Sequence, residues 1–219
     1  LNPELSSFKK IDLNAHHSNG TAMLYAIACC LISTVLSATA NDALRIQIEG
    51  LRAAKDSLLK TNPESPLLPE HREQFPGLDY YPVDLSYRLQ GELHIYGRQR
   101  QVDVPNTDGT TTTRLERYGR FVSALDGKDF WLEVYRSLET GENEVFFKDL
   151  TNGDTTYGGG RYARLIKEPN GLYLIDFNNA YNPYCDYNTA YICPLPPASN
   201  HLSFAIKAGE LKYGMNLAK

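Results

Sequence analysis

The sequence contains little that would indicate a nucleic-acid partner or a repeat architecture. Its formal net charge is −4 and no block of five like charges occurs, so we expect no nucleic-acid partner. No segment recurs at a fixed period, which argues against solenoids and propellers. Tryptophan (one) and methionine (two) are scarce, whereas the 15 tyrosines indicate half-buried aromatic surface of the kind that suits β-sheets.

Signatures of catalysis and of cofactor binding are also missing. Neither G-x-S-x-G nor H-E-x-x-H occurs, and the glycines of residues 157–162 (YGGGRY) lack the ending of a phosphate-binding loop. Those glycines more naturally permit a bulge or a close backbone approach, and we predict no cofactor. A hydrolase is an alternative, with His201 and either Asp176 or Cys193 as an acid–base pair, or with Asp176 and Glu210 as paired carboxylates.

The chain has four cysteines, which form two separate pairs. Cys29 and Cys30 are adjacent near the start, and Cys185 and Cys193 lie late in the chain. Seven residues separate Cys185 from Cys193, and in an exported chain a disulfide between them is the leading interpretation. Closing so short a loop would stabilise the fold by about 2.5 kcal/mol. Two free thiols are an alternative, as is a metal site with His201 and Asp186. Because the spacing does not match the close ligand pairs of zinc sites, we predict no metal.

A long uncharged run that is also largely apolar lies near the beginning of the chain, at residues 21–40. A signal peptide is one interpretation, with Lys9 and Lys10 as its basic start and residues 38–40 (ATA) as its exit. A retained membrane helix is another, since the run just reaches the roughly 20 residues that a span needs. Lipid attachment at Cys29 is a third, and a buried helix of a soluble protein is a fourth.

The first three interpretations share one consequence for location. They make residues 1–40 a signal peptide or membrane anchor, and they place the remainder outside the cytoplasm. We therefore expect an exported protein that is periplasmic or membrane-anchored. If residues 21–40 are not cleaved, they would contact the membrane and could hold the protein in a membrane complex.

Residues 41–86 are predicted to form a helix followed by a proline-rich extended segment. The helix would start at Asn41-Asp42 and stop at Asn62-Pro63. Spacings of three and four define its expected buried stripe, which consists of Leu44, Ile48, Leu51, Lys55 and Leu58, with Leu59 alongside. Four prolines and a glycine in residues 65–84 prevent another long element, although Pro69 can open one helical turn.

From residue 87 to the end, the pattern is that of an antiparallel β domain. Short stretches with a period of two are separated by turn residues, of which Asp126-Gly127 is the strongest hairpin signal. Gly119 is a candidate bulge, and the last strand is expected at residues 202–210. Eight or so strands without helical crossovers predict a mainly β fold, an antiparallel β-sandwich or barrel-like domain with an N-terminal helix. Residues 41–219 would form a single folded unit.

Four local motifs add a family resemblance. They are residues 65–84 (SPLLPEHREQFPGLDYYPVD), 147–162 (FKDLTNGDTTYGGGRY), 176–187 (DFNNAYNPYCDY) and 193–210 (CPLPPASNHLSFAIKAGE). Together they resemble the family catalogued as domain of unknown function family 1684, over roughly residues 45–212. Departures at Leu150-Thr151 and residues 188–191 leave the motif residues in place. The resemblance implies a mainly β domain and brings no established activity.

Residues 176–197, DFNNAYNPYCDYNTAYICPLPP, contain most of the candidate site. One interpretation is that their aspartate and asparagines form Asx turns that shape the loop. The other is a polar floor that holds a sugar or another small polar ligand between tyrosine faces and stiff prolines. In that case the ligand-binding residues are Tyr157, Arg161, Asp176, Asn178, Tyr181, Asn182 and Tyr187, with Arg161 facing an anion or pairing with Asp176.

These observations lead to one functional hypothesis with two alternatives. The leading hypothesis is a small-ligand-binding or structural module of the cell envelope that performs no catalysis. The alternatives are the hydrolase with Asp176, His201 or Glu210, and an accessory subunit of a membrane complex.

Overall fold

The computed structural model describes the backbone of residues 18–214 and the side chains of residues 38–214. The chain divides into two compact units, residues 1–44 and residues 45–219. The first unit contributes the beginning of helix α1 (Ser18–Thr61), and the second contains the rest of that helix and all of the strands.

Helix α1 is longer than the sequence predicted. It runs through Asn41 and Asp42, so the predicted start there is wrong: the preceding alanine- and leucine-rich residues already favour helix, and a cap acts only where a helix begins. Its end at Thr61, before Asn62-Pro63, agrees with the prediction. In the part of the chain that the structure describes, no helix is long and apolar enough to cross a membrane. Most of the predicted anchor segment, residues 21–37, lies outside the residues whose side chains are described.

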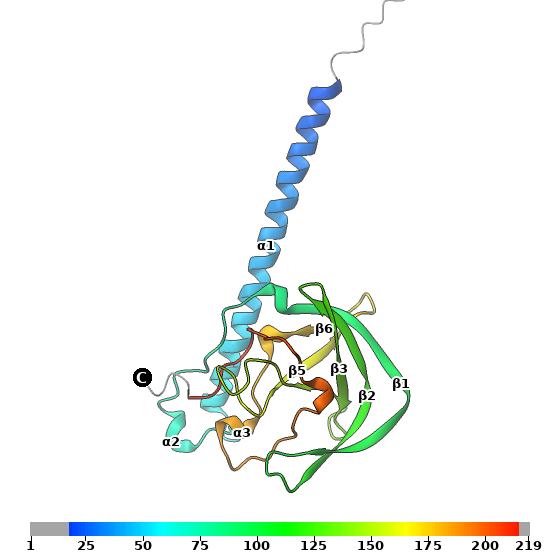
Figure 1. Cartoon of the computed structure of the whole chain (residues 1–219). Coiled ribbons are helices and arrows are strands. Elements are labelled where there is room, and N and C mark those ends of the chain that lie inside the picture. Colours follow the sequence, from blue (N-terminus) through cyan, green and yellow to red (C-terminus); the bar gives the residue numbers. More distant parts are fainter. Residues whose placement is uncertain (1–17, 215–219) are drawn as a thin grey trace, which may run out of the picture. The chain divides into compact units, whose positions relative to one another are not determined.

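Six antiparallel strands form a closed barrel in the order β1-β2-β3-β4-β5-β6, and Figure 1 shows β1 and β2 as its long curved members. The strands are β1 (Arg88–Pro105), β2 (Thr112–Leu125), β3 (Lys128–Arg136), β4 (Asn143–Phe147), β5 (Arg161–Lys167) and β6 (Tyr173–Asp176). Pairing of Arg88–Gly91 in β1 with Tyr173–Asp176 in β6 closes the barrel. The mainly β prediction is confirmed, and closure removes the exposed edges that a sandwich would have kept.

Turn residues fix the register of the longest hairpins. Asp126 and Gly127 both have positive φ, 52° and 72°, as a tight type I′ connection between β2 and β3 requires. The predicted bulge at Gly119 is confirmed, because the β2–β3 register shifts between Arg117 and Gly119. A Cβ at Gly119 would lie 2.7 Å from the carbonyl oxygen of His94, so the close strand approach there needs glycine.

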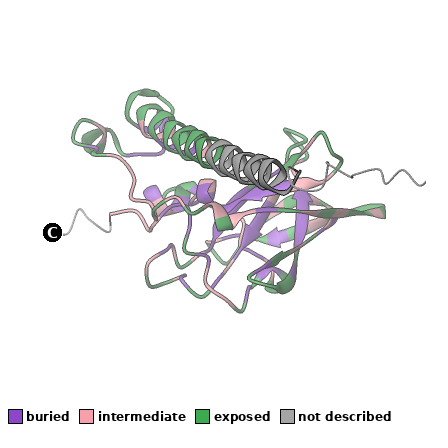
Figure 2. Cartoon of the chain, turned by 90° about the horizontal axis from the view of Figure 1, so that it is seen from above, coloured by how far each residue is buried: buried purple, intermediate pink, exposed green. Residues whose placement is uncertain are grey.

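Two hydrophobic clusters occupy opposite faces of the same strands. In β3, Val134 belongs to the main core and its neighbour Tyr135 to the second cluster; Phe147 and Phe146 divide in the same way in β4. Side chains alternate along a strand, so the main core fills the barrel and the second cluster lies outside it. Figure 2 shows that the buried residues concentrate in the strands and in the segments that cover them.

The short helices are α2 (Pro69–Arg72) and α3 (Tyr184–Tyr187), with the 3-10 turns η1 (Leu85–Tyr87), η2 (Phe177–Asn179) and η3 (Ala198–Asn200). The expected last strand at residues 202–210 is wrong, because this segment is an irregular loop. Its buried carbonyl groups at Ile206 and Ala208 accept hydrogen bonds from the Arg161 side chain instead of from a neighbouring strand. The count of eight strands therefore falls to six among residues 18–214.

Within the second unit, the face through which α1 packs agrees only in part with the predicted one. Ile48 and Leu59 are buried, but Leu51 and Leu58 are 52% and 61% exposed. Arg52 lies between the two buried residues and is 6% exposed. The docking face is thus a mixture of apolar side chains and cations that bond to the barrel.

Candidate functional site

The predicted polar floor at Asp176 and Asn178 is a structural turn. The backbone N–H of Asn178 donates to Oδ1 of Asp176 at 3.0 Å, which is the Asx turn that the first interpretation expected. Arg88 holds the other carboxylate oxygen at 2.8 Å, and Asn178 exchanges hydrogen bonds with the backbone of Asp84. Asp176 therefore pairs with Arg88 and not with Arg161, and both turn residues are fully bonded and buried.

Arg161 is completely buried, where it forms an ion pair with Asp149 at 2.8 Å. Its guanidinium also donates to the backbone carbonyls of Ile206 and Ala208, so it ties two distant loops together. Asp149 in turn accepts from the backbone N–H groups of Thr151 and Ile206. Arg161 is thus paired inside the protein and has no exposed surface on which it could meet the anionic ligand that the sequence suggested.

Asn182 and Tyr187 meet around Glu210, which is 1% exposed. Its carboxylate accepts hydrogen bonds from the Asn182 backbone N–H at 2.9 Å and from the Tyr187 hydroxyl, and it forms an ion pair with Lys55 of α1. Burial, with Glu210 close by, raises the pKa of Tyr187 well above its usual value. This cluster fastens the helix to residues 176–197, which gives those residues a structural role.

Tyr157 lies beside the two late cysteines, which are free thiols and both buried. The predicted disulfide is not formed in the structure, although the backbone N–H of Cys185 donates to Sγ of Cys193 at 3.3 Å. Tyr157 Oη lies 3.5 Å from Sγ of Cys185. The hydrogen bond from the Cys193 thiol lowers the pKa of Cys185 to about 6, and it raises the pKa of Cys193.

The hydrolase candidates do not share a contact among the described residues. Asp176 pairs with Arg88 and Glu210 with Lys55, whereas His201 is exposed and its backbone bridges to Lys148. No cluster of three or more metal-ligating side chains occurs in the part of the chain that the structure describes. Tyr181, the remaining predicted ligand residue, donates its hydroxyl to Glu144 at 2.7 Å.

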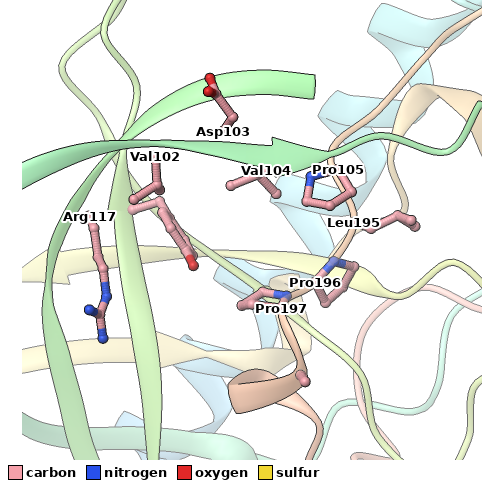
Figure 3. Close-up of a pocket in the computed structure, with 10 residues that line it drawn as sticks. Val102, Asp103, Val104, Pro105, Arg117, Leu195, Pro196 and Pro197 are labelled. Carbon is pink, nitrogen blue, oxygen red and sulfur yellow. The ribbon is translucent and has the colours of Figure 1, made fainter. Parts of the chain in front are cut away.

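A hollow of about 440 Å³ lies between β1 and residues 195–198, and we call it the proline hollow. Val102 and Val104 of β1 face Pro196 and Pro197 across it, and Arg117 stands at the end away from Leu195 (Figure 3). Asp103 points to the other side of β1. Its full lining is Val102, Asp103, Val104, Pro105, Arg117, Tyr135, Leu195, Pro196, Pro197 and Ala198.

The proline segment is held over the strands by backbone bonds at both ends. The backbone N–H of Leu195 donates to the carbonyl of Pro105 at 2.8 Å, and Tyr162 donates its hydroxyl to the carbonyl of Pro194. Beyond the prolines, Asn200 donates to the backbone carbonyls of Glu133 and Phe146 at 2.9 and 2.8 Å. The segment that the sequence singled out therefore covers the outer face of β3 and β4 and forms one wall of the hollow.

A second hollow of about 260 Å³ adjoins the first through Arg117, which lines both. We call it the arginine hollow; its other lining residues are Tyr96, Gly97, Arg98 and Arg100. It forms where the β1–β2 register breaks between Ile95 and Arg100, so that extra residues of β1 bend out of the ladder. Sequence reasoning anticipated the stiff prolines but missed both hollows, since Val102 and Pro196 meet only in the folded chain.

Comparison with known proteins agrees with this architecture. None of the curated proteins matches the chain. A solution NMR structure of an uncharacterized protein from Haloarcula marismortui is 33% identical; the match covers 78% of this chain and 96% of that one, with a TM-score of 0.61. Residues 73–211 match the family described as protein of unknown function (DUF1684), as the late motifs suggested. The chain therefore belongs to the DUF1684 family.

Proposed function

We propose that the barrel is a non-catalytic module that binds a small, partly apolar ligand in the proline hollow. The observation that carries this proposal is a hollow of about 440 Å³ with mostly apolar walls and a charged group at one end. Ligand pockets commonly have this size and this composition. Strands form one wall and prolines the other, so little conformational entropy is lost when a ligand enters.

A location in the cell envelope belongs to the same proposal. It is supported by the uncharged residues 21–40, which suit either a signal peptide or a membrane anchor. Fractionation of cells together with the intact mass of the purified protein would test it. A full-length protein in the cytosolic fraction would contradict the proposed location without affecting the hollow.

Titration of the ¹⁵N-labelled protein with 1-decanol tests the binding proposal. We expect amide shifts that concentrate on Val102, Val104, Tyr135 and Leu195, and saturate with a single dissociation constant. The Val102→Phe variant should weaken binding at least about tenfold, because the larger ring fills the hollow. Val122→Phe is the matched control, since Val122 is exposed on β2 and does not line the hollow.

Two results would contradict the proposal. One is the absence of localised shifts at any soluble concentration of decanol. The other is a folded Val102→Phe variant, judged by its amide spectrum, that binds decanol as tightly as the unmodified protein.

A further inference from the structure

Two cations of the arginine hollow are not neutralised within the part of the protein that the structure describes. Arg98 and Arg100 have no ion pair among the described residues. The nearest acidic residue on β1, Asp103, points to the other side of the strand and is bound there by Arg114 at 2.9 and 3.1 Å. In a chain with a net charge of −4, this is a local positive site.

The third arginine of the hollow is fixed in position. Arg117 donates to the buried carboxylate of Glu133 at 2.7 Å, and its guanidinium lies 4.8 Å from the ring centre of Tyr96. A guanidinium held by a carboxylate and an aromatic face keeps its remaining N–H groups in a fixed direction. Arg117 thus joins the two hollows as a rigid element and leaves the excess positive charge to Arg98 and Arg100.

Strand geometry connects the cationic end to the apolar walls. Arg100, Val102 and Val104 occupy alternate positions of β1, so they lie on one face of the strand. At 3.3 Å per residue, the distance from Val104 to Arg100 is about 13 Å. That face changes from apolar to cationic over the length of a medium-chain amphiphile.

We propose that the two hollows together bind a single-chain amphiphile with an anionic head group, either a carboxylate or a phosphate monoester. The head group lies against Arg98 and Arg100, and the apolar chain lies between β1 and Pro196-Pro197. Guanidinium groups bind both kinds of oxyanion through paired hydrogen bonds. This inference rests on the proposed function, because it assigns a ligand class to the proline hollow.

The test compares probes that share a chain and differ in the head group: decanoate, decyl phosphate and 1-decanol, each below its aggregation concentration. We expect the two anions to bind about tenfold more tightly than decanol at low salt, with an advantage that shrinks as salt is added. The double variant Arg98→Gln/Arg100→Gln should abolish that advantage and leave decanol binding unchanged. Arg164→Gln/Lys167→Gln is the control, because it removes the same charge from exposed positions on β5.

Each contrary outcome is informative. If decanol binds and the two anions bind no more tightly than decanol, the head-group site is wrong and the proposed function stands. The same conclusion follows if both double variants weaken the binding of the anions equally. If inorganic phosphate binds as tightly as decyl phosphate, the site takes a free anion, and the amphiphile is wrong. If none of the chain-bearing probes binds, both the proposed function and this inference fail.

Discussion

Arg161 illustrates how single charged residues hold this fold together. Its guanidinium is fully buried and bonds Asp149 together with two carbonyl groups of residues 206–208. Both members of the ion pair come from the motif of residues 147–162, in which the sequence analysis had assigned Tyr157 and Arg161 to ligand binding. A buried charge that is paired in this way is a structural anchor, although the Nε of Arg161 has no hydrogen-bond partner among the described residues. Removing one member of the ion pair leaves the other charge uncompensated.

We therefore expect Arg161→Met to lower the free energy of unfolding by about 3–5 kcal/mol. The matched control is Arg164→Met on the same strand, whose ion pair with Glu142 spans 3.8 Å and is exposed. That change should cost less than about 1 kcal/mol. Urea denaturation of both variants measures the difference, and equal losses would show that the buried pair is not an anchor.

Cys185 and Cys193 should differ in reactivity because one thiol donates to the other. The pKa of Cys185 is lowered to about 6 and that of Cys193 is raised. We expect alkylation of the native protein by iodoacetamide to modify Cys185 first, with a rate that rises through a midpoint near pH 6. Peptide mapping identifies the modified residue. In the Cys193→Ser variant a hydroxyl replaces the donating thiol, so the midpoint of Cys185 alkylation should move. A midpoint near pH 8.5 in both proteins would contradict the lowered pKa of Cys185.

At the scale of elements, local sequence patterns predicted the segments whose backbone groups bond to neighbouring strands. They failed for segments whose backbone groups bond to side chains. Alternation and the Asp126-Gly127 turn predicted the hairpins, because both are local requirements of a sheet. Residues 202–210 looked like a strand, but their carbonyl groups bond Arg161, which no local pattern reveals. The docking face of α1 was predicted only in part for a similar reason: of the two cations that anchor it, Arg52 was absent from the predicted stripe.

Arg52 and Lys55 show how these cations dock the helix. Arg52 donates to the carbonyls of Tyr81 and Asn178, both at 3.0 Å, and Lys55 reaches the buried Glu210. A hydrophobic pattern cannot anticipate such contacts, because the partner carbonyls are distant in sequence. The same limit applies to the proline hollow, where the sequence identified one wall and could not identify the strand opposite.

Two glycines in different elements should respond oppositely to alanine. Gly50 lies in α1 with no atom within 4 Å of an added Cβ, so Gly50→Ala should stabilise the protein by about 0.5–1 kcal/mol. Gly209 has φ +79°, and an added Cβ would lie 2.6 Å from the carbonyl oxygen of Ala180. Gly209→Ala should therefore destabilise the fold by more than about 1 kcal/mol. Thermal unfolding of the two variants measures both signs, and the same sign in both would contradict this argument.

At the scale of the whole molecule, one polar cluster joins three distant parts of the chain. Lys55 comes from α1, Tyr187 and Asn182 from the segment of residues 176–197, and Glu210 from the final loop. Asp186 extends the cluster, since its carboxylate accepts from the Asn182 side chain and from the backbone N–H of Tyr213, each at 2.8 Å. Buried polar bonds thus fasten the segments that enclose the β-barrel, alongside an apolar cluster of Leu59, Leu67, Phe75 and Tyr187.

This cluster should make stability depend on pH. Burial, with Glu210 nearby, raises the pKa of Asp186 from 3.8 to about 6. The folded protein therefore binds this proton more tightly than the unfolded chain does. The resulting stabilisation is fully present below about pH 3.8 and is lost as pH rises through about 6, by an amount on the order of 1–3 kcal/mol.

Asp186→Asn tests this dependence, because the amide oxygen can accept the same two hydrogen bonds without titrating. Urea denaturation of both proteins between pH 4 and pH 7.5 gives two curves of unfolding free energy. Their difference should change most between about pH 4 and pH 6 and level off above pH 6, with the unmodified protein losing relative stability toward neutral pH. Since every other titrating group is common to both proteins, parallel curves would mean that Asp186 is ionised throughout this range and that the closure of the fold does not depend on its proton.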